Sequence, residues 1–438
     1  MALFAHQTTA NTTAHKDGIG AHSTATLPPP PPLDALGRRT LTDHCDYLLQ
    51  ATTPQPEFGI KLFDALGLTL CENIKGDGNV PVADLAEIDG YAVRATDTEF
   101  ANEDLQAVGQ LVMLPVLEPA PVLPKGNAIR VTAGEPIPLG ADAVVPLALI
   151  EERAGNEIAL LRVFQTGEWV RPAGSDVTDR VVFARSGEVI TETLLALLAA
   201  AGLDRVLTRP AARVSVLSFD HITDPEAIAT TDRRGRHLHS ACSFLIGAKL
   251  LGDGAKVWRN DVTSLEPDKL HELIDSELIR SDLIVATSAL GIGAVREELA
   301  RMGVVDACQV AVTPGGEQVF AIIGEHQTPV FVLPADPAAA FFSYHMFIRP
   351  VLRKLTGVLP HRPQSKLCFA SEDMVSEPGV FELCPVKLHT TAGRLVATPC
   401  GQPQLTTLAD LAQANAIVGL PEDKTEIKAG EPLQAWEF

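Results

Sequence analysis

Apolar residues recur with two different spacings between Arg213 and Gly357, and their alternation predicts the class of the fold. Short runs rich in Val, Ile and Leu indicate buried strands, whereas apolar positions three and four residues apart indicate helices. Strands that alternate with helices form a doubly wound, mainly parallel sheet, which binds ligands at the carboxyl ends of its strands. The expected strands are 214–218, 256–258, 282–286, 308–312, 319–323 and 330–333, and the expected helices are 243–251, 265–279, 295–302 and 338–355.

The segments on either side of this region are predicted to contain shorter elements. Residues 105–185 are rich in Val, Pro and Gly, which favours edge strands such as 128–132 and 143–147 in a small β-domain. The segment after Pro363 is expected to be all-β, with a turn at Ala392-Gly393. Helices are expected from Thr42 to just before Pro54, over Phe58–Leu66, and over Thr191–Ala201, where Thr191 can cap the helix.

Residues 1–32 lack any apolar periodicity and end in five consecutive prolines, Pro28 to Pro32. A segment of this kind buries too little apolar surface to offset its ordering entropy, so a disordered arm is expected. The prolines would form a polyproline II spacer or a docking ligand, and the spacer is favoured.

The composition narrows the classes of function. A net charge of −20 argues against non-specific binding to nucleic acid, and no run of 18 apolar residues could cross a membrane. Seven scattered cysteines without a CxxC motif are typical of reduced thiols, so neither a disulfide framework nor a zinc site is expected. No signal peptide is recognisable, and a cytoplasmic protein is expected.

Asp89-Gly90 is a turn signal immediately before an apolar run, which places a carboxylate at the entrance of a strand. It could contact a ligand or a metal there, or form an ordinary Asx turn. The stretches 89–94, 130–145, 170–176, 206–357 and 333–337, taken in this order, resemble the molybdopterin molybdenumtransferase family, whose members include the C-terminal domain of gephyrin.

The resemblance covers roughly residues 40–438 and implies an elongated homodimer with four domains in each chain. The expected boundaries are 33–80 with 166–205, 81–165, 206–357 and 358–438, after the arm 1–32. It also implies a reaction in which molybdate enters adenylylated molybdopterin with the help of Mg²⁺. Such chemistry needs carboxylates for the cation, and lysines or arginines for the anions.

Some family positions are retained and others are changed. Asp89 and Asp176 match the carboxylates of the family, and Thr132 matches its hydroxyl. The strand-end motif T-G-D-E is replaced by residues 218–222, where only Asp220 is acidic, and the lysine pair of K-P-G-K-P is absent from Thr313–Glu317. The resulting candidates are Asp89 and Asp176 for catalysis, and Thr132, Asp220, Ser288, Gly291, Gly293, Pro314 and Gly315 for cofactor binding.

Two hypotheses follow. In the first, the chain is a gephyrin-like dimeric adaptor, catalytically inactive, that binds a short peptide from a receptor tail or from a cytoskeletal or cell-division protein. It would need no cofactor. In the second, it is an active molybdenumtransferase that uses Mg²⁺ and molybdopterin. An aromatic cluster is either packed in the core, which is the default, or lines the peptide groove: Phe341, Phe342, Tyr344 and Phe347.

Overall fold

The computed structural model describes residues 27–99, 111–219, 240–262, 266–288, 293–334, 336–402 and 405–438. These residues form two compact units. The first comprises the chain up to Thr52, Ala212–Leu352 and Pro363–Phe438, and the second comprises Thr53–Ala211 and Arg353–Arg362. No helix in the described ranges has the length and apolarity required to span a membrane.

The first unit is built on a seven-stranded mixed sheet. Strands β21, β17, β15 and β16 are parallel to one another, and β1 is parallel to β18. Only β20 runs antiparallel to both of its neighbours, β18 and β21. The order is β1 (Arg38–Arg39), β18 (Gly303–Val310), β20 (Glu317–Ile323), β21 (Thr328–Pro334), β17 (Leu283–Ser288), β15 (Arg213–Ser218) and β16 (Lys256–Asp261). The predicted doubly wound sheet is therefore confirmed.

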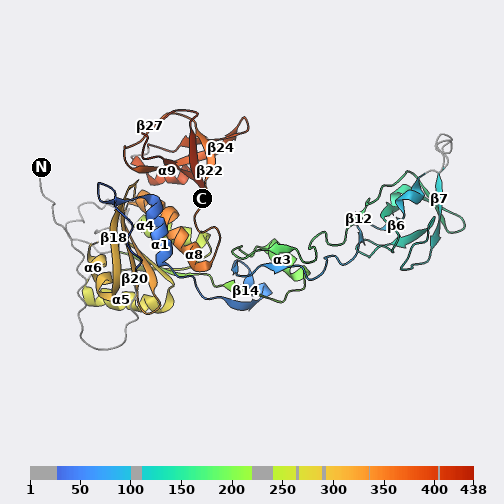
Figure 1. The fold of residues 1–438 in the computed structure, drawn as a ribbon, viewed down its shortest axis with the longest axis horizontal. Coiled ribbons are helices and arrows are strands. Elements are labelled where there is room, and N and C mark those ends of the chain that lie inside the picture. The colour runs from blue at the N-terminus through green and yellow to red at the C-terminus, as the bar shows by residue number, and fades with distance from the viewer. Residues whose placement is uncertain are drawn as a thin grey trace, which may run out of the picture. The chain divides into compact units, whose positions relative to one another are not determined.

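Helices cover both faces of this sheet (Figure 1). On one face lie α5 (Pro267–Arg280) and α6 (Gly293–Met302), whose Ile274 and Leu299 pack in a core with Leu217, Phe219 and Val332. On the other face lie α4 (Ser240–Gly252) and α7 (Pro337–Ser343). A π-helical turn η5 (Tyr344–Ile348) and α8 (Arg349–Thr356) continue α7, and α1 (Leu41–Ala51) contacts η5.

The aromatic residues of α7 and η5 correct one expectation. Phe341, Phe342, Tyr344 and Phe347 are all buried, each at most 2% exposed. Phe347 contacts His44 of α1, Phe341 contacts Phe438, and the Tyr344 hydroxyl donates to Asp253. With this burial they offer no surface to a peptide. Core packing is the default interpretation of such a cluster and it holds here, whereas the assignment of these residues to a peptide groove is wrong.

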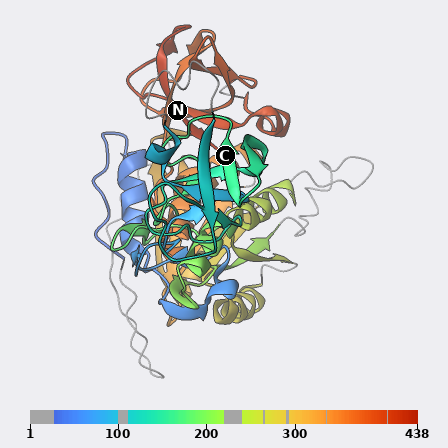
Figure 2. The ribbon, with the colours of Figure 1, turned by 90° about the vertical axis from the view of Figure 1, so that its right-hand side faces the viewer.

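The C-terminal part of the first unit is a small β-barrel, red in Figure 2. Its strands close into a ring because β24 pairs with both β25 and β26. The sheet comprises β19 (Val312–Thr313), β24 (Phe381–Thr391), β25 (Arg394–Pro399), β22 (Lys366–Ala370), β28 (Pro432–Glu437) and β26 (Ala416–Leu420), beside a separate pair, β23 (Met374–Val375) and β27 (Glu426–Ile427). The segment is not all-β, because a capping box between Thr407 and Asp410 starts helix α9 (Leu408–Gln413).

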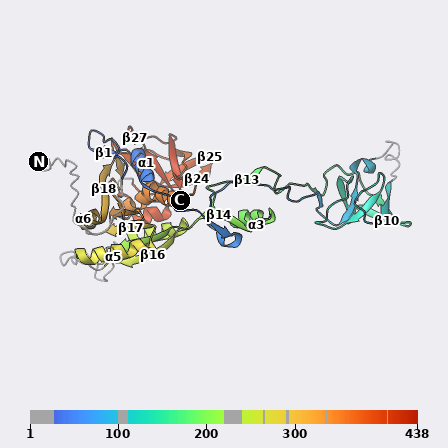
Figure 3. The same cartoon turned by 60° about the horizontal axis from the view of Figure 1, so that its bottom comes forward.

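The second unit contains a six-stranded sheet, around the label β10 in Figure 3, together with smaller elements. The sheet order is β10 (Ile150–Arg153), β11 (Glu157–Leu160), β7 (Val112–Leu117), β8 (Ala128–Val131), β6 (Gly90–Val93) and β9 (Ala143–Pro146). The smaller elements are β2 (Phe58–Lys61), β3 (Thr69–Leu70), β4 (Ile74–Lys75), β5 (Leu85–Ala86), β12 (Val170–Arg171), β13 (Val182–Ala184), β14 (Arg205–Arg209), α3 (Glu192–Ala200), η1 (Leu62–Ala65), η2 (Ala95–Thr98) and η3 (Leu147–Leu149).

Two local expectations for this unit had different outcomes. Thr191 caps α3 as predicted, since its side chain accepts a hydrogen bond from the Leu194 N–H. The helix expected over Phe58–Leu66 is wrong: its first half is strand β2, paired with β14, and only Leu62–Ala65 is helical. The pairing with β14 supplies backbone hydrogen bonds that a helix would otherwise provide.

The structure also divides the domain expected at 33–80. Strand β1 pairs with β18, and α1 contacts η5, so residues 38–51 belong with the large sheet, and the division between the two units follows Thr52. Residues 53–80 belong to the second unit. Of the arm predicted at 1–32, only residues 27–32 are described, and they have no regular secondary structure.

Candidate functional site

The carboxyl ends of three parallel strands lie in a row in the first unit. Ser218 at the end of β15 is in register with Thr287, and Ser288 at the end of β17 is in register with Pro334. This edge is where a doubly wound sheet binds its ligands. Of the residues expected here, Ser288 ends β17 and Gly293 begins α6, whereas Asp220 and Gly291 lie outside the described residues.

An apolar side chain follows the first of these strand ends. Phe219 is fully buried in the core beneath α5 and α6, and its N–H donates to the Thr287 carbonyl at 3.0 Å. Its ring therefore serves packing, and this position has no polar side chain to hold an anion.

Pro314 and Gly315 lie in the loop between β19 and β20, against α7. Gly315 has a φ of +97°, and a Cβ there would lie 3.1 Å from Ser343 Oγ, so glycine is needed for this close approach. Gln318 Nε2 donates to the Gly315 carbonyl at 2.6 Å and to Ser343 Oγ at 2.9 Å. The loop is thus tied to the helix through protein contacts.

The charged residues of this loop and of the N-terminus of α7 are negative. Thr313–Glu317 contains no lysine or arginine, and Glu317 is exposed. Asp336 is exposed and caps α7, because its Oδ2 accepts a hydrogen bond of 2.7 Å from the Ala339 N–H. The carboxylate of Asp336 therefore occupies the helix N-terminus, a position that could otherwise attract an anion.

Asp89 and Thr132 are brought together in the second unit. Asp89 Oδ1 accepts a hydrogen bond of 2.8 Å from the Ala133 N–H, and Glu135 Oε2 accepts one of 3.0 Å from the Thr132 N–H. The side chains of Asp89 and Thr132 are exposed. This contact joins Asp89 to a loop 44 residues away and is therefore not the local Asx turn that was considered, and the Asp89 carboxylate still has free acceptor capacity.

The segment that contains Asp176 joins the same loops. Strand β12 pairs with β5, the Glu87 N–H donates to the Trp169 carbonyl at 2.9 Å, and the Ala86 N–H donates to the Glu135 carbonyl at 2.9 Å. Asp176 itself forms an ion pair with Arg171. Three motif stretches distant in sequence therefore form one loop cluster, in which Asp176 is already paired with a cation.

The described residues do not place Asp89 or Asp176 in a group of three potential metal ligands. They contain one such group, His44, Asp306 and Cys308. There, Arg39 binds both Asp306 oxygens at 2.6 and 2.7 Å. Burial and the Arg39 charge lower the pKa of His44 to about 3, and burial raises the pKa of the Cys308 thiol to about 12. Asp306 is the only hard oxygen ligand, so the group does not suit Mg²⁺.

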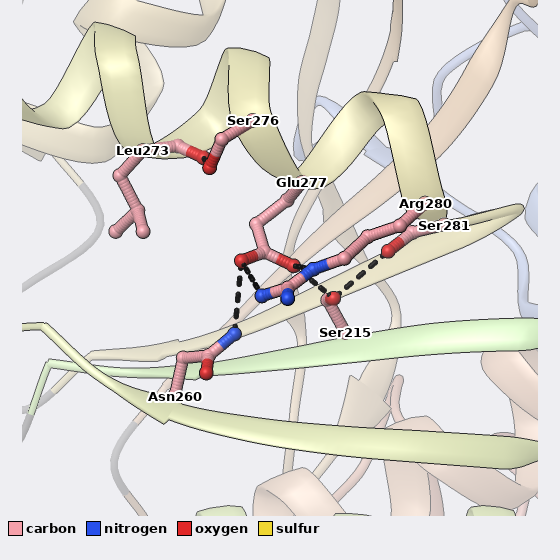
Figure 4. Close-up of polar contacts among 7 residues, drawn as sticks. All are labelled: Ser215, Asn260, Leu273, Ser276, Glu277, Arg280 and Ser281. Carbon is pink, nitrogen blue, oxygen red and sulfur yellow. Dashed lines mark hydrogen bonds and ion pairs between the residues drawn. The ribbon is translucent and has the colours of Figure 1, made fainter.

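A second polar cluster in the first unit is buried and fully bonded (Figure 4). Glu277 of α5 is 1% exposed and accepts hydrogen bonds from Asn260 at 2.9 Å, from Arg280 Nε at 2.8 Å, and from Ser215. Ser281 donates to Ser215 at 2.8 Å. These contacts link α5 to strands β15 and β16, and the carboxylate has no exposed surface for a ligand.

A groove suited to a partner was missed by sequence reasoning. A groove of about 580 Å³ lies between the start of α1 and the β-barrel, and its lining includes Leu41, Leu367, Phe381, Leu433 and Trp436. The rings of Phe381 and Trp436 lie 6.4 Å apart, and Leu367 is 57% exposed. A sequence signal existed: Trp436 alternates along β28 with the buried Leu433 and Ala435, which places a large aromatic ring off the barrel core.

Comparisons with known proteins agree with the fold. The family profile of the MoeA N-terminal region (domain I and II) matches residues 39–202, and that of the MoeA C-terminal region (domain IV) matches 370–438. Molybdopterin molybdenumtransferase 2 of Mycobacterium tuberculosis is 30% identical over 419 residues, which cover 91% of this chain and all of the relative. Gephyrin of Dictyostelium discoideum is 24% identical over 420 residues, covering 86% of this chain and 58% of gephyrin.

A solved structure shows the same fold. The molybdopterin biosynthesis moeA protein from Pyrococcus horikoshii superimposes with a TM-score of 0.69 at 22% identity, over 92% of this chain and all of that chain. The expected multidomain α/β fold, with a mixed sheet and small β-domains, is confirmed.

Proposed function

This chain belongs to the MoeA family of molybdopterin molybdenumtransferases, and we propose that within the family it acts as a dimeric adaptor that binds a short linear peptide. The groove between α1 and the β-barrel is the observation that carries the proposal. It is large enough for several side chains and is lined mainly by apolar and aromatic groups.

The groove favours a peptide with a large apolar or aromatic anchor. Leu367, Phe381 and Trp436 form its apolar floor, and Thr40, Gln434 and Glu422 supply polar groups along it. Glycine at 419 keeps space beside Phe381, since a Cβ at this position would overlap the ring. Buried aromatic anchors dominate the energetics of such recognition. The candidate partners are the tail of an intracellular receptor, or that of a cytoskeletal or cell-division protein.

The electrostatics of the sheet edge support an adaptor over an enzyme. Phe219 fills the end of β15, Glu317 adds a negative charge, and Asp336 caps α7. Each charge-assisted contact to a phosphate contributes about 1.5–3 kcal/mol, so the two missing lysines would weaken anion binding by roughly a hundredfold or more.

A homodimer with two grooves would gain avidity for a clustered or polymeric partner.

The alternative is an active molybdenumtransferase, which the retained loop cluster around Asp89, Thr132 and Asp176 favours. That reaction would require Mg²⁺ and molybdopterin. The described residues bring no third potential ligand close to Asp89 or Asp176, and Asp176 is paired with Arg171. Mg²⁺ is usually held by one or two carboxylates together with waters and substrate phosphates, so the exposed Asp89 carboxylate is the group that would hold it in the alternative function.

The two functions can be separated by binding measurements on the full-length chain. A peptide-display library should yield a consensus with an apolar or aromatic anchor. Trp436→Ala should weaken binding of that peptide roughly tenfold or more. The control is Trp258→Ala, on β16 and 39% exposed, which should have no effect. Calorimetry with molybdopterin, its adenylylated form and molybdate should show no binding. Tight binding of the adenylylated form without a peptide consensus would overturn the adaptor.

A further inference from the structure

A second cavity in the first unit has a different chemical character. It has a volume of about 440 Å³ and is lined by residues of α4, η5 and α8 and by the ring of Phe438. Lys249, Asp253, His345 and Arg349 are the charged or polar residues in its lining. None of them lines the peptide groove.

Lys249 is a half-buried cation without a hydrogen-bond acceptor among the described residues. Its Nζ lies 4.3 Å from the ring centroid of Phe438 and 4.9 Å from that of Phe341. Burial lowers the pKa of Lys249, and the nearby Asp253 charge opposes this effect. The two rings stabilise the ammonium through cation–π contacts, but they cannot accept its N–H bonds as a carboxylate would.

Asp253, the acidic side chain of the lining, is already bound by other groups. Asp253 Oδ1 accepts a hydrogen bond from Arg349 Nε at 3.1 Å and forms an ion pair with Arg349 Nη2 at 2.9 Å. Asp253 Oδ2 accepts from the Tyr344 hydroxyl at 2.5 Å. The side-chain carboxylate of the lining is therefore taken up by Arg349 and Tyr344, and Lys249 forms no direct ion pair within the described residues.

His345 adds a buried group with unused bonding capacity. It is 3% exposed, and its Nε2 is buried without a hydrogen-bond partner among the described residues. Burial, reinforced by the charges of Lys249 and Arg349, lowers its pKa, so the imidazole is neutral and retains one N–H donor. Buried polar groups without partners are uncommon in proteins and call for an explanation.

We propose that this cavity binds a small organic anion, whose carboxylate or phosphate group contacts Lys249 and Arg349. Its apolar part would lie against Leu245, Ala248 and the ring of Phe438. The volume lies within the range of small-molecule sites. The anion would supply the acceptor that Lys249 lacks. This inference does not depend on the peptide-binding function.

The test is titration of the full-length chain with benzoate and with phenyl phosphate, beside benzamide as a neutral analogue of similar shape. At least one anion should bind saturably and roughly tenfold or more tightly than benzamide. The two anions distinguish a carboxylate ligand from a phosphate ligand. Absence of saturable binding by both, or equal binding of benzamide, would overturn the proposal.

Variants locate the binding. Lys249→Gln should weaken binding of the anion roughly tenfold or more, whereas Lys249→Arg should largely retain the affinity. Lys256→Gln, an exposed lysine at the start of β16, is the matched control and should bind like the wild type. Unchanged affinity in folded Lys249→Gln would place the anion elsewhere and contradict the proposal.

Discussion

Asp89 and Ala133 are joined by a hydrogen bond of 2.8 Å from the backbone N–H of Ala133 to Asp89 Oδ1. This contact links the strand-entrance turn before β6 to the loop after β8. Asp89 therefore has a structural role that does not require a metal or a substrate. The same exposed carboxylate is also the one that the family resemblance places in a catalytic position, so its substitution distinguishes the two functions.

Asp89→Asn should leave peptide binding intact. The asparagine carbonyl can still accept from the Ala133 N–H, so the free energy of unfolding should fall by no more than about 0.5–2 kcal/mol. Complementation of a molybdenumtransferase-deficient host provides the functional measurement, with Asp77→Asn at an exposed position as control. The adaptor predicts no rescue by any form of the protein. Rescue by the wild type that is lost only in Asp89→Asn would establish the transferase instead.

Gly90→Ala should destabilise the second unit. A Cβ at Gly90 would clash with the backbone carbonyl of Val145 in the neighbouring strand β9. Overpacking against backbone costs about 1–3 kcal/mol in the free energy of unfolding. Gly59→Ala in strand β2 is the control, because a Cβ at that position would have no other atom within 4 Å. Equal urea midpoints for the two variants would refute this packing argument.

Glu277→Ala should destabilise the first unit by about 2–4 kcal/mol, because Ser215 and Asn260 would lose their buried acceptor. Arg280 is half-exposed, so its charge can be solvated and adds less to the loss. Glu272→Ala, at an exposed position of the same helix, should change the free energy of unfolding by less than about 0.5 kcal/mol. Urea unfolding followed by circular dichroism measures both. A similar effect of the two substitutions would show that the buried network contributes little.

The stability of the first unit should fall in acid because of His44. Its pKa is lowered from 6.5 to about 3 in the folded chain, so the unfolded chain binds the proton more readily. The contribution of neutral His44 is therefore complete above the unfolded pKa and is lost as the pH falls toward 3. The expected slope is up to about 1.4 kcal/mol per pH unit between these limits.

Urea unfolding at several pH values in that range tests this expectation. His44→Gln should flatten the slope, whereas His389→Gln, at an exposed position of β24, should leave it unchanged. An unaltered slope in folded His44→Gln would assign the acid sensitivity to other groups, such as the buried His345.

The chain should sediment as a dimer. The family resemblance motivates this expectation, and exposed apolar side chains such as Phe63 and Leu66 remain on the second unit. Sedimentation equilibrium at micromolar concentration should give twice the chain mass of 46.7 kDa. A stable, folded monomer under these conditions would contradict the prediction and remove the avidity argument for the adaptor.

The sequence by itself determined the elements that depend on local periodicity and capping. The alternation between residues 213 and 357 predicted the doubly wound sheet, and Thr191 marked the start of α3. The predicted turn at Ala392-Gly393 is also present, and both residues have positive φ angles. Residues close together in the sequence determine these features, so the local pattern of side chains is enough to predict them.

Only the tertiary structure decided the features that join distant segments. Residues 58–61 form a strand because β14 supplies the hydrogen bonds, which outweighs their weak local preference for a helix. Arg39 meets Asp306, and Glu277 meets Ser215, across separations that no local pattern encodes. Whether an apolar side chain lies in the core or on the surface depends on which distant residues pack around it. The structure therefore places Phe341 in the core and Trp436 in the lining of a groove.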